Sequence, residues 1–105
     1  MTLPAEVDVS NAEQIRRDLA AVVAQDASLV IADMSTTTFC DSAGVTALVR
    51  AVRQANASGA GLRLAASAPA VTRVLAITGV DRLIEIYPSV AAAMADPDGR
   101  APQPG

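Results

Sequence analysis

Apolar residues recur along the chain first at helical and then at strand-like spacing, and each change of spacing predicts a new element. The first stripe at helical spacing predicts a helix over about residues 11–25; its members are Ile15, Leu19, Val22 and Val23. The segment Leu3–Val9 before it is long enough only for a stub of strand. The intervening Ser10-Asn11-Ala12-Glu13 has the spacing of a capping box, with Ser10 as the cap and Glu13 reaching back to it.

A strand, a polar loop and a second helix follow. Leu29–Ala32 is apolar without alternation, which is typical of a strand buried on both faces of a parallel sheet. Residues 33–41 are polar and predict a loop at the carboxyl end of that strand. A helix is then expected over about residues 42–58, with an apolar stripe made of Val45, Leu48, Val49 and Val52.

The second half of the chain continues the alternation. Gly59-Ala60-Gly61 follows a helix instead of opening one, so it predicts a helix cap and turn, not a dinucleotide site. The remaining predicted elements are a strand over 62–66, a helix from Pro69 to a cap at Gly79, a strand over 83–87 and a short helix to about residue 95. Residues 96–105 have no apolar period and predict a disordered tail, which leaves one domain over residues 1–95.

Helices and strands in alternation predict an α/β fold with a small, mostly parallel sheet and about four helices. Functional sites of such sheets gather at the carboxyl ends of the strands. The loop over residues 33–41 and the helix start at Ser42 are therefore the leading candidate site.

The residue types that the chain lacks exclude several kinds of active site. It has no His, and all eight basic residues are Arg, so imidazole catalysis, Schiff-base lysines and phosphate-loop lysines are excluded. Its single cysteine, Cys40, excludes an internal disulfide, and a net charge of -3 argues against a nucleic-acid surface. No apolar run has the length of a membrane span. We therefore expect a cytoplasmic binding or switch module without a cofactor, not an enzyme.

The segment Asp41-Ser42-Ala43-Gly44 is the strongest candidate for chemistry. Such residues at a helix start are usually only caps, but here they follow a long loop, and small neighbours leave room around the Ser42 hydroxyl. A phosphate there would meet free backbone N–H groups and the positive end of the helix dipole. It would add about 1.5 to 2 negative charges in one step. This argument alone does not distinguish Ser42 from Ser35 or Thr38 as the acceptor.

Three segments resemble the signature of the anti-sigma factor antagonists, the STAS-domain family. Asp33-Met34-Ser35, followed by Phe39-Cys40-Asp41-Ser42-Ala43-Gly44-Val45, resembles the family's acceptor block. Glu6-Val7-Asp8 with Asn11-Ala12 resembles the family's entry to its first helix, and Leu75–Val80 resembles the turn before its last strand. The resemblance covers about residues 5–95 and keeps their order and spacing.

The resemblance implies partner switching in the regulation of bacterial transcription. Unphosphorylated members of the family bind an anti-sigma factor that is also a serine kinase, and this binding releases the sigma factor. Phosphorylation ends the binding. The family's phosphoacceptor corresponds to Ser42, and Asp8 matches an acidic residue that lies near it. The resemblance also implies partner contacts from Asp8, Asp33, Asp41, Ala43 and Gly44.

The chain departs from the family pattern in three places. Only Met1–Ala5 precede Glu6-Val7-Asp8, where the family has one strand and most of a second, so an N-terminal strand is expected to be shortened or absent. An open sheet edge favours a homodimer. Ala43 leaves Ser42 as the single acceptor of its block, and Gly44-Val45-Thr46 replaces the commoner Gly-Leu-Gly.

Two other classes of function remain as alternatives. One is a non-switching STAS scaffold, as in a stressosome-like or lipid-transport complex, and the other is a small enzyme or nucleotide-binding domain. The intact acceptor block favours the switch, and the missing His and Lys argue against the enzyme. Cys40 is expected to be a small buried residue, not a redox handle. Asp8, Asp33 and Asp41 are expected to be solvated or dipole-matched carboxylates, not metal ligands.

Overall fold

The computed structural model describes residues 1–25 and 28–96, and it confirms the predicted α/β fold. The strands are β1 (Glu6–Val7), β2 (Leu29–Asp33), β3 (Phe39–Cys40), β4 (Gly61–Ala65) and β5 (Glu85–Tyr87). The helices are α1 (Ala12–Val23), α2 (Ser42–Ala57), α3 (Pro69–Ile77) and α4 (Val90–Ala95), and a 3₁₀ turn, η1 (Val80–Arg82), precedes β5. The predicted tail lies outside the described residues, except for Asp96.

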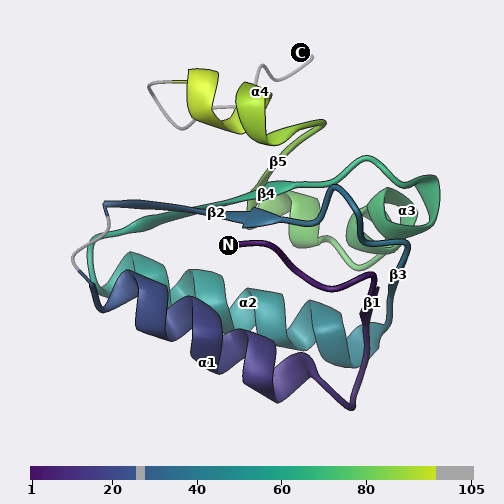
Figure 1. The fold of residues 1–105 in the computed structure, drawn as a ribbon, viewed down its shortest axis with the longest axis horizontal. Coiled ribbons are helices and arrows are strands. Elements are labelled where there is room, and N and C mark those ends of the chain that lie inside the picture. The colour runs from purple at the N-terminus through teal and green to yellow at the C-terminus, as the bar shows by residue number, and fades with distance from the viewer. Residues whose placement is uncertain (26–27, 97–105) are drawn as a thin grey trace.

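The strands form two parallel groups. One sheet has the order β2-β4-β5, with Val30 opposite Leu62 and Leu64 opposite Ile86. The other is the short pair of β1 and β3. In Figure 1, α1 and α2 lie side by side on one face of the larger sheet, and α4 covers the opposite face. The short β3 falls inside the segment expected to be a loop, because two residues are too few to show a strand period.

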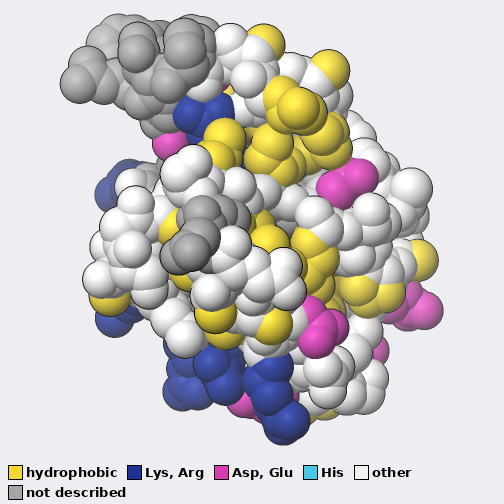
Figure 2. All heavy atoms as spheres, turned by 60° about the vertical axis from the view of Figure 1, so that its left-hand side comes forward, with side chains coloured by type: hydrophobic (Ala, Val, Ile, Leu, Met, Phe, Trp, Pro, Cys, Tyr) yellow, Lys and Arg dark blue, Asp and Glu magenta, His cyan; other side chains and the backbone are white. Residues whose placement is uncertain are grey.

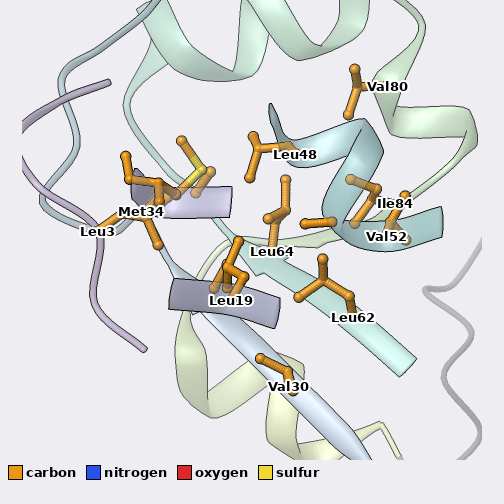
Figure 3. Packing of buried hydrophobic residues seen from close by; sticks show 14 of the residues in the cluster. Leu3, Leu19, Val30, Met34, Leu48, Val52, Leu62, Leu64, Val80 and Ile84 are labelled. Carbon is orange, nitrogen blue, oxygen red and sulfur yellow. The ribbon is translucent and has the colours of Figure 1, made fainter. Parts of the chain in front are cut away.

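The core lies between the larger sheet and the paired helices α1 and α2. Figure 3 shows side chains from both helices and from β2 and β4 meeting there. Leu48 of α2 and Leu64 of β4 are fully buried, and Leu19 of α1 is only 1% exposed. Burying such side chains contributes about 1.5 to 3 kcal/mol each, so this layer holds the sheet and helices together.

The start of α1 differs from the predicted capping box. The Ser10 hydroxyl donates to the Asp8 carboxylate instead of capping the helix. Glu13 pairs with Arg16 at 2.5 Å instead of reaching back. The cap position belongs to Asn11, whose side chain makes no capping hydrogen bond. The Asp8 carboxylate is a charged acceptor for both the N–H and the hydroxyl of Ser10. These hydrogen bonds explain why Ser10 forms a turn with Asp8 instead of the predicted capping box.

The end of α2 has the predicted cap. Gly59 has a φ of 80°, and the Ala60 N–H donates to the Ala55 carbonyl at 2.9 Å, as in a Schellman motif. Gly79 also has a φ of 80° and follows α3. Both glycines therefore occupy the left-handed conformation that L side chains avoid.

The first three residues pair with one end of β2. The Asp33 N–H donates to the Met1 carbonyl at 2.7 Å, and the Leu3 N–H donates to the Asp33 carbonyl at 2.8 Å. The Thr37 hydroxyl holds the next turn by donating to the Pro4 carbonyl at 2.8 Å. Residues 1–3 thus pair with β2 only through an isolated parallel bridge, with Thr2 opposite Asp33, and form no strand of the larger sheet. This pairing covers part of the outer edge of β2. The expected homodimer stays a prediction.

A buried arginine anchors α4. Arg63 of β4 is only 4% exposed, its guanidinium donates to the Ala93 carbonyl of α4, and it lies 5.5 Å from the centre of the Tyr87 ring. The Tyr87 hydroxyl donates to Asp96 at 2.8 Å. Burial, followed by this hydrogen bond, raises the Tyr87 pKa above its usual value. In sequence Arg63 is simply a cation between two leucines, so its structural role was not predicted.

Candidate functional site

The candidate site forms where the parallel strands β1 and β3 end. Their register sets Val7 opposite Cys40, so Asp8 and Asp41 follow at adjacent positions. The Asp41 N–H continues the pairing by donating to the Val7 carbonyl at 3.1 Å. Residues 33 positions apart in sequence therefore reach the same end of one strand pair, as the resemblance implied for Asp8.

Ser42 is the first residue of α2 and is exposed. Asp41 precedes it as the cap, and its carboxylate accepts the Gly44 N–H at 3.0 Å. The N–H groups of Ser42 and Ala43 donate to no acceptor within the described part of the chain. The first N–H groups of a helix have no intrahelical partner and carry the positive end of its dipole. Ser42 thus presents a hydroxyl beside two available donors.

Gly44 brings the start of α2 against the strand pair. A Cβ at this position would lie 2.7 Å from Val7 Cγ1 and 2.8 Å from Cys40 Sγ. Both distances are too short for carbon and sulfur, so only glycine fits without a shift. Gly44 is itself buried, so it packs the start of α2 closely on the strand pair, and its expected contact with a partner stays a prediction.

Asp8 supports the turn between β1 and α1. Its carboxylate accepts hydrogen bonds from the hydroxyl and the N–H of Ser10, and these hold the Asp8 pKa below its usual value. Asn11 closes the turn, because its amide donates to the Glu6 carbonyl at 2.8 Å and its oxygen accepts the Asp8 N–H at 3.0 Å. This network fixes the turn and leaves Val9 at its tip, 80% exposed.

Asp33 occupies a different environment from the other acidic residues. Its carboxylate accepts the Ser35 N–H at 2.9 Å. Hydrogen bonding by the Ser35 side chain, and to a smaller extent by this N–H, lowers the Asp33 pKa. It lines a pocket of about 400 Å³ together with Ile31, Val90 and Met94. Those last two residues belong to α4, on the face of the sheet opposite α1 and α2. The structure therefore brings Asp8 and Asp41 together but does not bring Asp33 to them.

A groove extends from the site along the space between α1 and α2. It has a volume of about 170 Å³, and its floor is made of the small residues Ala12, Ala43 and Ala47. Val9, Glu13, Arg16, Thr46 and Arg50 complete its lining. Helical spacing predicts both helices, but nothing in the sequence indicates that they face each other across a hollow. Among the described residues, no three His, Cys, Asp or Glu side chains lie close enough to hold a metal ion.

Cys40 is buried beneath the site, at 3% exposure. Burial, with a smaller effect of the nearby Asp41 carboxylate, raises its pKa to about 11 from an ordinary 9.0. The thiolate is the reactive form of cysteine. Burial therefore lowers both the access to the sulfur and the fraction of it that can react.

We expect native Cys40 to react with iodoacetamide at pH 8 at least about 100-fold more slowly than the same chain in denaturant, because a pKa two units higher lowers the thiolate fraction by about that factor. Mass spectrometry of timed, quenched samples measures both rates. Rates within a few-fold of each other would contradict the burial and allow a redox role.

One family model matches this chain, and the similar solved structures share its fold. The family model described as the STAS domain matches residues 1–93. An anti-sigma factor antagonist from Mycobacterium paratuberculosis has a TM-score of 0.80 at 25% identity, covering 89% of this chain and 79% of that one. The unphosphorylated form of the anti-sigma factor antagonist SpoIIAA has a TM-score of 0.75 at 22% identity, covering 96% and 88%.

A third structure shows the same fold in a much larger protein. The murine Solute Carrier 26 anion transporter Slc26a9 has a TM-score of 0.73 at 24% identity, covering 89% of this chain but 16% of the transporter. No described helix of the present chain is long and apolar enough to cross a membrane. The comparison with curated protein sequences finds no significant match. From the family match over nearly its whole length, the chain belongs to the STAS-domain family.

Proposed function

We propose that this STAS domain is an anti-sigma factor antagonist switched by phosphorylation of Ser42. In this function the unphosphorylated protein binds an anti-sigma factor with serine kinase activity and so releases a sigma factor. The observation that carries the proposal is the exposed Ser42 hydroxyl at the start of α2, beside two N–H groups without an acceptor in the described residues. The similarity to a Mycobacterium paratuberculosis protein named as such an antagonist supports it.

Phosphorylation would change the charge of a site that is already acidic. Asp41 caps the helix directly before Ser42, and Asp8 lies at the adjacent position of the strand pair. A phosphate adds about 1.5 to 2 negative charges next to them. The helix dipole and the available N–H groups would stabilise this phosphate. A partner bound over this surface, however, would have to bury the added charge. The local fold is kept while binding is lost.

The residues around Ser42 divide into two roles. Asp41 and Gly44 position the acceptor, through the 3.0 Å cap and the close packing on Val7. Ala43 and Asp8 are half-buried and border the acceptor, so they are proposed to contact the partner. Asp33 can contribute only if the partner also reaches the α4 face of the sheet. The domain itself supplies a substrate hydroxyl and a binding surface, and no catalysis is proposed.

The test uses an anti-sigma factor kinase encoded in the same genome. With this kinase and ATP, the wild-type protein is expected to gain one phosphate and Ser42→Ala none, because Ser42 is the hydroxyl at the helix start. Intact-mass spectrometry counts the phosphates, and peptide mapping locates them. Ser35→Ala and Thr38→Ala are matched controls, since both residues are exposed and precede α2.

Binding of the same kinase tests the switch. Ser42→Asp is expected to weaken binding by about 10- to 100-fold, which corresponds to about 1 to 3 kcal/mol of coupling. Its circular dichroism spectrum and melting temperature should match those of the wild type. Full labelling of Ser42→Ala would overturn the acceptor. Equal affinity of the phosphorylated and free proteins would favour a non-switching scaffold.

A further inference from the structure

We propose that the partner contact extends from Ser42 along the groove between α1 and α2, with Val9 as an apolar anchor and Arg50 as the receptor for a carboxylate of the partner. This inference rests on the proposed function and adds to it a surface and a chemistry of recognition. The groove is defined by the eight residues that line its volume of about 170 Å³.

Val9 occupies a fixed position beside the groove. It is 80% exposed, yet it sits on a turn fixed by the hydrogen bonds of Asp8 and Asn11. A rigid apolar side chain loses little conformational freedom when a partner covers it. Val9 lines the groove together with Ala43, the residue directly after Ser42. A partner that covers the Ser42 hydroxyl therefore meets Val9 at the same step.

The arginines that line the groove differ in their ion pairs. Arg16 is engaged by Glu13 at 2.5 Å, and the same carboxylate lies 3.7 Å from Arg17. Arg50 lines the far part of the groove, and among the described residues it forms no ion pair. Arginine side chains gather along the lower edge of the molecule in Figure 2, where α1 and α2 lie in Figure 1. The Ser42 end is acidic and the Arg50 end basic, so the complementary partner segment carries a carboxylate toward Arg50.

The floor of the groove is made of small side chains. Ala12, Ala43 and Ala47 leave a hollow where larger side chains on either helix would fill the space. Thr46 stands at the rim, and its hydroxyl donates to the Ser42 carbonyl at 3.0 Å. A segment of the partner with one apolar side chain over the alanines and an acidic residue beyond it fits this shape and charge.

The experiment measures the affinity of the unphosphorylated full chain for the purified anti-sigma factor kinase used above. Val9→Ser and Arg50→Glu are each expected to weaken binding by at least about 10-fold, since central anchors and desolvated charges dominate such interfaces. Met94→Ser and Arg53→Glu are the matched controls, expected to stay within about twofold. Met94 is 69% exposed but belongs to α4, and Arg53 is exposed on α2 without lining the groove.

The outcomes separate the groove from the switch. If Ser42→Asp weakens binding while Val9→Ser and Arg50→Glu do not, the groove is overturned and the proposed function stands. If the groove variants weaken binding and Ser42→Asp does not, the groove is supported and the switch fails. Equal losses in the controls would also overturn the groove, because the effect would then be unspecific. A wild-type protein that binds no anti-sigma factor overturns both.

Discussion

Replacing Arg63 with methionine is expected to lower the free energy of unfolding by about 3 kcal/mol, because it leaves a buried carbonyl and an aromatic face without their cation. The Arg63 guanidinium donates to the Ala93 carbonyl and lies over the Tyr87 ring. Arg63 and Tyr87 are each only 4% exposed. Methionine keeps most of the apolar stem, so the loss reports on the charged end. Urea denaturation measures it.

The matched control for this change is Arg53→Met on the exposed face of α2. An exposed arginine away from such contacts is expected to change stability by no more than about 0.5 kcal/mol. Equal denaturation midpoints for the two variants would show that the buried cation contributes nothing to holding α4. The Arg63 variant should still present Ser42, because α4 lies on the opposite face of the sheet from α2.

Gly44→Ala is expected to destabilise the protein by about 1 to 2 kcal/mol, although alanine favours a helix by about 1 kcal/mol over glycine. The new Cβ would lie 2.7 Å from Val7 Cγ1 and 2.8 Å from Cys40 Sγ. Val7 is fully buried, so the overlap can be relieved only by moving α2 away from the strand pair. Overpacking of this kind typically costs about 1 to 3 kcal/mol, which exceeds the gain in helix propensity.

A double-mutant cycle separates overlap from other causes. Val7→Ala removes the Cγ1 atom that the new methyl would meet, so Gly44→Ala should cost about 1 kcal/mol less in that background. Thermal denaturation of the four proteins gives the coupling. Additive effects of the two substitutions would contradict the packing argument. Gln54→Ala, at an exposed position of the same helix, is the control for a general effect of α2 substitutions.

The periodic elements were predictable because their signals are local. The stripe of Val45, Leu48 and Val52 repeats at the spacing of one helix face, and Leu48 and Val52 are indeed buried. Gly59 and Gly79 were predicted as caps because no other residue adopts a positive φ without strain, and both have a φ of 80°. The acceptor block could also be identified from the sequence, since Asp41, Ser42 and Gly44 lie within four consecutive residues at one helix start.

The rest depended on contacts between segments far apart in the chain. The sequence alone determined the order of the four helices and of the strands β2, β4 and β5, and the helix start at Ser42. Only the tertiary structure decided that the two-residue strands β1 and β3 pair and bring Asp8 to Asp41, while Asp33 faces α4. The tertiary structure also formed the groove from Val9 to Arg50, because a hollow between two helices depends on how they pack and not on either helix alone. The physical reason is that periodicity reports which face of an element is buried, but not which other element covers it.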